Sequence, residues 1–195
     1  VSLSTQPGKL VGIVGANGCG KSTLIKTTFG TVPKQGGTIT LDGQPVSRFA
    51  PRELASILGY VGQDSSCAFD FTVSDVVTMG LFARKDRKNG KQIVQAAMEE
   101  LGVDKLAQRN IQSLSGGERK MVFIARAIAH QPKLIFADEP TGALDTNTAI
   151  NVVKIFKELC AAQGVSIVMT THDTGFMEIG DAVYELEGGE VISEH

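Results

Sequence analysis

The sequence lacks any hydrophobic run long enough to cross a membrane. A membrane-spanning helix needs about 18 or more apolar residues in succession. The longest apolar patches among the 195 residues, such as Leu10–Val14 and Leu134–Ala137, have only the length of strands. The chain also lacks a basic excess, because its formal net charge is −2, whereas a dedicated nucleic-acid binder would carry one. We therefore expect no direct contact with nucleic acid, and any action at a membrane would require a partner protein.

Cysteine is scarce as well. Cys19, Cys67 and Cys160 are the three present, and they show no CxxC pair or other metal-ligand spacing. Such a set argues against a cysteine-based zinc site, and its odd, scattered distribution is typical of reducing compartments. The first residues show no basic segment followed by an apolar one, as a signal peptide would. We therefore expect a cytoplasmic protein.

Short apolar runs predict the core of the fold. Such runs are typical of strands buried in a parallel sheet, and four are present, at Leu10–Val14, Ile57–Val61, Leu134–Ala137 and Val165–Met169. They alternate with helical stretches, among them an amphipathic helix over Thr148–Gln163. This alternation predicts an α/β fold with a doubly wound sheet.

Two turn signals predict additional strands. The turn Asp42-Gly43 follows Gly37–Leu41 and predicts a small antiparallel β unit. The turn Gly188-Gly189 lies within Glu178–Val191 and predicts a strand pair near the end of the chain.

The middle of the chain has a different pattern. Helical periodicity runs through Val73–Phe82 and Lys91–Leu101, and no clear strand lies nearby. We therefore expect one domain over residues 1–195, in which residues from about 65 to 113 form an inserted helical subdomain.

A glycine-rich segment predicts a phosphate site. Residues Gly15–Ser22 read GANGCGKS, which matches G-x-x-x-x-G-K-[ST], and they lie between an apolar strand and the helical stretch Thr23–Phe29. Glycines allow backbone N–H groups to turn toward phosphate oxygens, and a helix N-terminus adds partial positive charge. Lys21 is expected to reach the β- and γ-phosphates, and Ser22 to bind Mg²⁺. An ordinary glycine-rich turn is the alternative, but the correct flanking elements argue against it.

Polar residues follow three of the predicted strands. Because ligands lie at the carboxyl ends of parallel strands, Asp138 is expected to hold Mg²⁺ and Glu139 to polarise an attacking water as general base. Gln63 is expected to orient water or contact Mg²⁺, and His172 to bind the γ-phosphate. Each alone has a simpler interpretation as a solvated loop residue; their shared edge of the sheet favours the site.

The segment LSGGE (Leu114–Glu118) precedes a helix. Ser115 and Glu118 form an S-x-x-E capping box, which accounts for both of them. It does not account for Gly116 and Gly117, because each glycine in a first helical turn costs up to about 1 kcal/mol relative to alanine. Paired glycines expose N–H groups at a positive helix end, which predicts a second phosphate contact.

These segments together resemble the ABC ATPase family. In family order, over nearly the whole chain, they are GANGCGKST (Gly15–Thr23), YVGQD with Gln63, LSGGE, LIFADEP (Leu134–Pro140), Ala143-Leu144-Asp145, and TTHD with His172. The resemblance implies a P-loop NTPase core with a parallel sheet, a small antiparallel β subdomain and an inserted helical subdomain. It also implies ATP and Mg²⁺ as ligands and hydrolysis of ATP as the activity.

The resemblance assigns roles residue by residue. The catalytic set it implies is Glu139, His172, Gln63 and Lys21, and the metal set is Ser22, Gln63 and Asp138. The nucleotide-binding set it implies is Gly15, Ala16, Asn17, Gly18, Cys19, Gly20, Lys21, Ser22, Thr23, Ser115, Gly116, Gly117 and Asp145. Asp138 is similar to the Walker B aspartate, and Asp145 to the D-loop aspartate.

The family mechanism implies two partners. Two ATPase subunits, here expected to be identical, would pair head-to-tail, with each ATP between one P-loop and the LSGGE of the other copy. A transmembrane permease would hold the chain at the inner face of the cell membrane. ATP closes the dimer and hydrolysis reopens it.

Two segments of the sequence indicate different classes of transported cargo. The segment Phe69–Arg84 resembles ATPases that import iron chelates, haem or cobalamin, whereas Ala137–Asp145 resembles lipoprotein-release and peptide-export ATPases. We expect an importer.

No aromatic residue precedes Gly15, whereas members of the family have one there that stacks on adenine. Truncation of the N-terminal edge is the expected reason. The alternatives are a soluble ABC ATPase without a transport role and a non-catalytic nucleotide sensor; Glu139 and His172 argue against the sensor.

Overall fold

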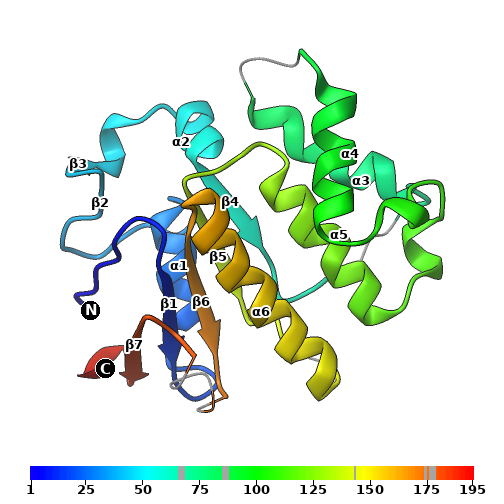
Figure 1. The fold of residues 1–195 in the computed structure, drawn as a ribbon. Helices are drawn as coiled ribbons and strands as arrows, with labels where there is room; N and C mark the ends of the chain where they lie inside the picture. The colour runs from blue at the N-terminus through cyan, green and yellow to red at the C-terminus, as the bar shows by residue number, and fades with distance from the viewer. Residues whose placement is uncertain (66–68, 85–87, 143, 174, 176–178) are drawn as a thin grey trace.

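The computed structural model describes residues 1–65, 69–84, 88–142, 144–173, 175 and 179–195. Cys67, Ala143 and Glu178, which entered the sequence interpretation, lie outside these ranges. In Figure 1 a sheet flanked by helices occupies one side of the molecule, and a group of helices the other. Among the described residues, no helix is both long and apolar enough to cross a membrane.

The core is a six-stranded, mostly parallel sheet, as the sequence predicted. The strands, in the order in which they lie, are β4 (Leu58–Val61), β5 (Leu134–Asp138), β6 (Ser166–Thr171), β1 (Leu10–Val14), β7 (Ala182–Glu187) and β8 (Glu190–Glu194). Only the β7–β8 pair is antiparallel. Strands β1, β5 and β6 are buried throughout because helices cover both faces of the sheet.

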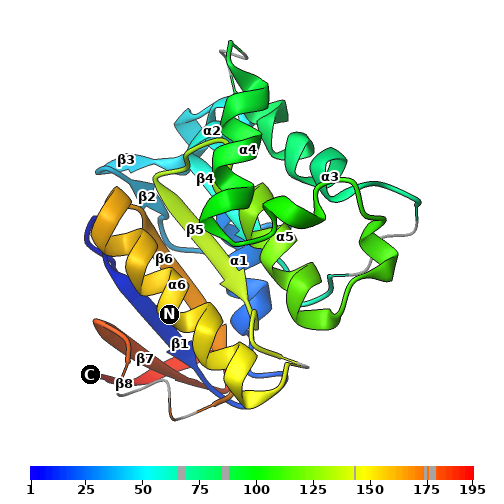
Figure 2. The same ribbon diagram turned by 45° about the vertical axis from the view of Figure 1, so that its right-hand side comes forward.

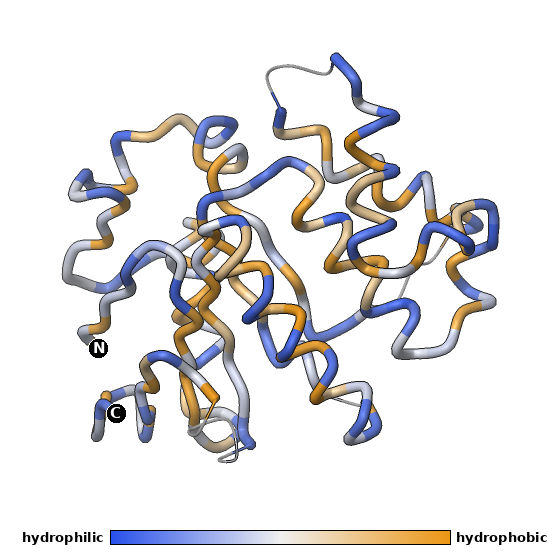
Figure 3. The backbone as a smooth tube through the Cα atoms, viewed as in Figure 1, coloured by the Kyte–Doolittle hydropathy of each residue, from blue (hydrophilic) through white to orange (hydrophobic). Residues whose placement is uncertain are grey.

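Two hydrophobic clusters cover the two faces. Helix α6 (Thr146–Gln163) packs Phe156 and Leu159 against one face, and this cluster continues into the helical group. Helices α1 (Lys21–Thr28) and α2 (Pro51–Ile57) cover the opposite face through Ile25 and Leu54. Figure 2 shows α6 lying along the sheet, and Figure 3 shows hydrophobic residues both in the strands and in the helices.

The described part of residues 65–113 is helical. It contains α3 (Val73–Met79) and α4 (Gly90–Glu100), with short 3₁₀ turns at Gly80–Ala83, Asp104–Leu106 and Ile111–Ser113. Its described residues hold one isolated β-bridge, between Thr72 and Asn110, and no longer strand. Helix α5 (Gly116–Ile128) follows and packs against α3, α4 and β4, so it links this group to the sheet.

The predicted small antiparallel unit is also present. Strands β2 (Thr40–Leu41) and β3 (Gln44–Pro45) pair across a two-residue turn, and a 3₁₀ turn at Val46–Arg48 follows. Asp42 and Gly43 have φ values of 49° and 75°, which is the pattern of a type I′ hairpin turn.

Candidate functional site

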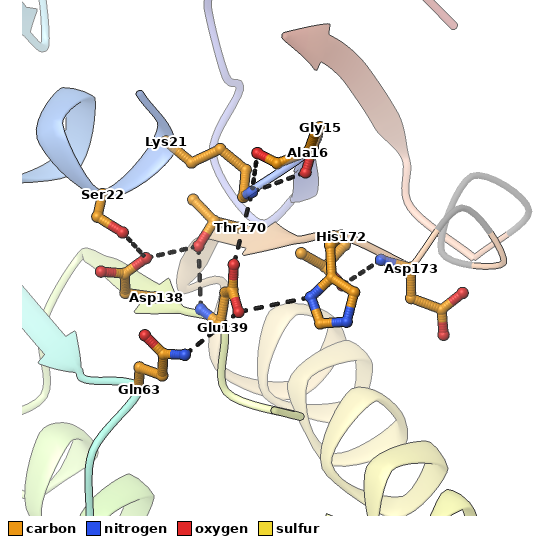
Figure 4. Close-up of polar contacts among 11 residues, drawn as sticks. Gly15, Ala16, Lys21, Ser22, Gln63, Asp138, Glu139, Thr170, His172 and Asp173 are labelled. Carbon is orange, nitrogen blue, oxygen red and sulfur yellow. Dashed lines mark hydrogen bonds and ion pairs between the residues drawn. The ribbon is translucent and has the colours of Figure 1, made fainter. Parts of the chain in front are cut away.

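The carboxyl ends of four strands gather the predicted residues at one edge of the sheet. Parallel register pairs Val14 of β1 with Thr171 of β6, and Asp138 of β5 with Thr170 of β6. The loop after β1 therefore lies beside the residues that follow β4, β5 and β6. Figure 4 shows Lys21, Ser22, Gln63, Asp138, Glu139 and His172 converging on one region.

The loop between β1 and α1 needs glycine for two different reasons. A Cβ atom on Gly15 would lie 2.3 Å from the carbonyl oxygen of Leu186 in β7, so no side chain fits there. Gly18 and Gly20 have φ values of 83° and 108°, which a residue with a side chain rarely adopts. The predicted ligands Ala16, Asn17 and Gly18 are exposed on this loop. The loop therefore approaches the sheet closely at Gly15 and is exposed to solvent over the next three residues.

Lys21 places a buried cation at the centre of the site. Its side chain is 4% exposed, and Nζ donates hydrogen bonds to the carbonyl oxygens of Gly15 (2.7 Å) and Ala16 (3.1 Å). The same atom lies 3.5 Å from Glu139 Oε1. An ammonium group has three donors that can rotate among acceptors, so Lys21 can exchange a carbonyl partner for an anionic one without leaving the loop.

Ser22 and Asp138 form a hydroxyl–carboxylate pair. Ser22 Oγ donates a hydrogen bond of 2.9 Å to Asp138 Oδ1, and Asp138 is buried. Hydroxyl and carboxylate oxygens are the donors that Mg²⁺ prefers, so these two residues fit a magnesium site. Burial, and then the charge and hydrogen bond of Asp138, raise the pKa of Tyr60 on β4. Its phenol is therefore a neutral neighbour of the pair.

Thr170 is a site residue that the sequence interpretation missed. Its side chain is 0% exposed; Oγ1 donates to Asp138 Oδ1 (2.8 Å) and accepts a hydrogen bond from the Glu139 backbone N–H (2.9 Å). The one available signal was a hydroxyl residue near the end of the strand, two positions before His172. Thr170, on β6, therefore forms hydrogen bonds with both predicted acids, at the carboxyl end of the neighbouring strand β5.

Glu139 adopts an unusual backbone conformation. Its φ is 44°, in the left-handed region, which costs a residue with a side chain of order 1–3 kcal/mol and is characteristic of functional sites. Its N–H is held by Thr170 through both the hydroxyl group and the carbonyl oxygen, the latter at 3.2 Å. With the backbone held in this way, the Glu139 carboxylate lies beside the Lys21 ammonium group.

Two further predicted residues meet the same carboxylate. Gln63 Nε2 donates to Glu139 Oε2 at 3.4 Å, and His172 Nδ1 lies 3.5 Å from that oxygen. With Lys21 at the other oxygen, three groups surround Glu139, one from the start of α1, one from the segment after β4 and one from the segment after β6. This is the geometry of a carboxylate whose orientation is controlled and which can accept a proton from a bound water. A role for Gln63 as a metal ligand stays a prediction.

The LSGGE segment begins α5, and the capping box is present as predicted. Ser115 Oγ accepts a hydrogen bond from the Glu118 N–H (3.3 Å), and Glu118 Oε2 accepts from the Ser115 N–H (2.8 Å), which lowers the pKa of Glu118. Gly116 has open space where a Cβ atom would lie, whereas a Cβ on Gly117 would meet Thr148 Cγ2 of α6 at 2.9 Å. Among the described residues, no hydrogen bond or ion pair joins this segment to the loop after β1.

Asp145 has a structural task at the start of α6. It is the N-cap, and Thr148 donates to its two carboxylate oxygens from the backbone N–H (3.1 Å) and from Oγ1 (2.6 Å). These bonds lower its pKa, with the side-chain bond as the larger cause. A direct contact of Asp145 with nucleotide therefore stays a prediction, as do the ligand roles of Cys19 and Thr23.

Comparison with known proteins gives concordant matches. The family model described as ABC transporter matches residues 1–142. An uncharacterized ABC transporter ATP-binding protein of Bacillus subtilis, YvrA, is 38% identical over 179 residues, which cover 89% of this chain and 40% of that protein. The cobalamin import ATP-binding protein BtuD of Halobacterium salinarum is 36% identical, covering 89% and 44%. The hemin import ATP-binding protein HmuV of Hahella chejuensis is 34% identical, covering 100% and 78%. The chain thus spans less than half the length of two of these relatives.

Solved structures agree in fold. CbiO1 of Clostridium perfringens, part of the ABC transporter complex cbiONQ, superposes with a TM-score of 0.88 at 27% identity, covering 100% of this chain and 79% of that one. Two dimeric structures of the cassette MJ0796, one of them in a post-hydrolysis state with ADP and Pi, each give a TM-score of 0.86 at 27% identity, covering 99% and 87%.

Proposed function

This chain belongs to the ABC transporter family, and from that premise we propose that it is the ATP-binding and ATP-hydrolysing subunit of a membrane transporter. One observation carries the proposal. The Glu139 carboxylate lies among Lys21, Gln63 and His172, directly beside the hydroxyl–carboxylate pair of Ser22 and Asp138. A base, a cation and a metal-binding pair at one sheet edge are the parts that hydrolysis of a phosphoanhydride requires.

The residues act in sequence on a nucleotide bound at this edge. Backbone N–H groups of Gly15–Ser22 and the positive end of α1 bind the phosphates, and Lys21 turns from the Gly15 and Ala16 carbonyls toward them. Mg²⁺, held by Ser22 and Asp138, would neutralise phosphate charge. Glu139 accepts the proton of the attacking water, and Gln63 orients that water. His172 donates a hydrogen bond to the terminal phosphate.

The second half of the site comes from another copy of the chain. The first turn of α5 is open at Gly116 and has no polar contact with the loop after β1 among the described residues. The dimeric structures of MJ0796 support head-to-tail pairing. In such a pair, Ser115, Gly116 and Gly117 of one copy contact the phosphate that Lys21 of its partner holds. One terminal phosphate then links both copies, so its hydrolysis releases them.

The transport role is that of an importer. Relatives that import hemin and cobalamin support import rather than export. The proposed cargo is an iron chelate, haem or cobalamin. A transmembrane permease, bound at the inner face of the cell membrane, is the required partner; cbiO1 supports it as a subunit of a larger transporter complex.

Replacing Ser115 by arginine tests the proposed function. We expect the purified chain to hydrolyse ATP with Mg²⁺, and we expect Ser115→Arg to lower kcat roughly 100-fold because it removes transition-state donors. The bulky side chain would also block the approach of a partner's phosphate. Steady-state phosphate release measures kcat for the parent chain and for the variant.

A matched control separates the site from the helix cap. Thr72 caps α3 with the same reciprocal box, accepting from the Asp75 N–H at 3.1 Å. Thr72→Arg therefore removes an equivalent cap, and we expect it to retain hydrolysis. Equal losses in the two variants would mean that Ser115 acts only through helix stability and would contradict the proposal.

A further inference from the structure

A second lysine is as fully buried as Lys21 at the start of α1. Lys120, on α5, is 2% exposed, compared with 4% for Lys21. Its Nζ donates hydrogen bonds to the backbone carbonyl oxygens of Gly62 (3.1 Å) and Gln63 (3.0 Å). Burial lowers the pKa of this ammonium group, and the nearby Asp64 carboxylate opposes that effect. A buried cation is retained only where such partners compensate for the loss of water.

These two bonds fix the segment that carries Gln63. Gly62 and Gln63 follow directly after β4, and their carbonyl groups are held from α5 rather than from the sheet. The Gln63 side chain contacts a different residue, Glu139, whose Oε2 lies 3.4 Å from Gln63 Nε2. A continuous path of polar contacts therefore runs from α5 through Gln63 to Glu139.

The other end of this path is the first turn of α5. Lys120 lies one turn after Gly116 and Gly117, on the same helix. Helices move as rigid elements, so a shift of Ser115 or of these glycines displaces the Lys120 ammonium group as well. The two carbonyl groups that it holds would shift with it.

We infer that Lys120 is a positioning residue that couples the LSGGE turn to Gln63. Contact of this turn with the nucleotide held by a partner copy then sets the position of the Gln63 amide in the nucleotide site of its own copy. This inference rests on the proposed function, because it assumes that LSGGE contacts the nucleotide of a second copy. It assigns Lys120 a task that a purely structural buried cation would not have: its effect on hydrolysis passes through Gln63.

A double-mutant cycle tests this inference. Lys120→Met keeps an unbranched side chain and removes the donors; we expect it to lower kcat about tenfold, as loss of a supporting contact typically does, with little change in KM. In a Gln63→Ala background, Lys120→Met should cause no further loss, because residues that act through one another are not additive. Lys154→Met on α6, an exposed lysine, is the control for loss of a positive charge and should retain kcat.

Each other result overturns the inference. An unchanged kcat in Lys120→Met, or the same tenfold loss in both backgrounds, would show that Lys120 does not act through Gln63. If Lys120→Met does not fold, the same cycle is measured with Lys120→Gln, whose shorter amide has two N–H donors in place of three; a smaller loss of kcat is then expected, again absent in the Gln63→Ala background. Wild type and Glu139→Gln are assayed in parallel: absence of hydrolysis in the wild type contradicts the proposed function, whereas an additive cycle beside an active wild type contradicts this inference alone.

Discussion

Glu139→Gln is expected to lower ATP hydrolysis roughly 1,000-fold, because loss of a general base removes a proton acceptor from the transition state. Glutamine preserves the size of the side chain and can still contact Lys21 and His172. It cannot accept the proton of an attacking water. Nucleotide binding should therefore persist while turnover nearly stops, and Mg²⁺–ATP affinity and phosphate release measure the two effects separately.

The same substitution has a second expected consequence. Because the nucleotide is no longer consumed, it should hold two copies together, and sedimentation or size-exclusion chromatography with ATP should detect a dimer that ADP does not support. Glu158→Gln, at an exposed position in the second half of α6, is the matched control for loss of a carboxylate. Wild-type turnover in Glu139→Gln would contradict the role assigned to Glu139.

Lys21→Ala is expected to weaken Mg²⁺–ATP binding about 100-fold, since truncating one partner of a buried, hydrogen-bonded charge pair has effects of this size. The change removes the buried ammonium group and leaves Glu139 Oε1 without the cation that lies 3.5 Å away. Both effects add negative potential where phosphates would bind. Isothermal titration of the variant and the parent chain with Mg²⁺–ATP measures the change.

A lysine near the other end of the same helix provides the control. Lys26 is exposed in the last turn of α1, so Lys26→Ala removes an equal charge without touching the site. It should bind nucleotide as the parent does. Unchanged affinity in Lys21→Ala, with the fold verified by thermal unfolding, would mean that the loop after β1 does not hold the phosphates as we propose.

Strand positions could be predicted where burial alone determines them. The boundaries of β1 were predicted correctly because its apolar run stands between Lys9 and the glycine-rich loop that starts at Gly15. By contrast, β6 extends to Thr171, two residues beyond the predicted Met169. Two threonines in succession look like the start of a loop, yet pairing of β6 with β1 and β5 continues through them.

Contacts between strands or helices could not be predicted from local pattern. The hydrogen bond from Thr170 to Asp138 depends on the register of β5 against β6. The left-handed conformation of Glu139 also depends on Thr170, which lies 31 positions later in the chain. Likewise, the pattern of α5 shows that Lys120 lies one turn into a helix but not that its ammonium group reaches the backbone after β4.

Mixing two inactive variants tests most directly whether each nucleotide is shared between two copies. Lys21→Ala lacks a working loop after β1, and Ser115→Arg lacks a working LSGGE turn, so each alone should be nearly inactive. A mixed dimer contains one site with both parts intact, and random pairing of equal amounts should restore about a quarter of wild-type hydrolysis. A mixture that stays as inactive as its two components, although the copies are seen to exchange, would contradict the account.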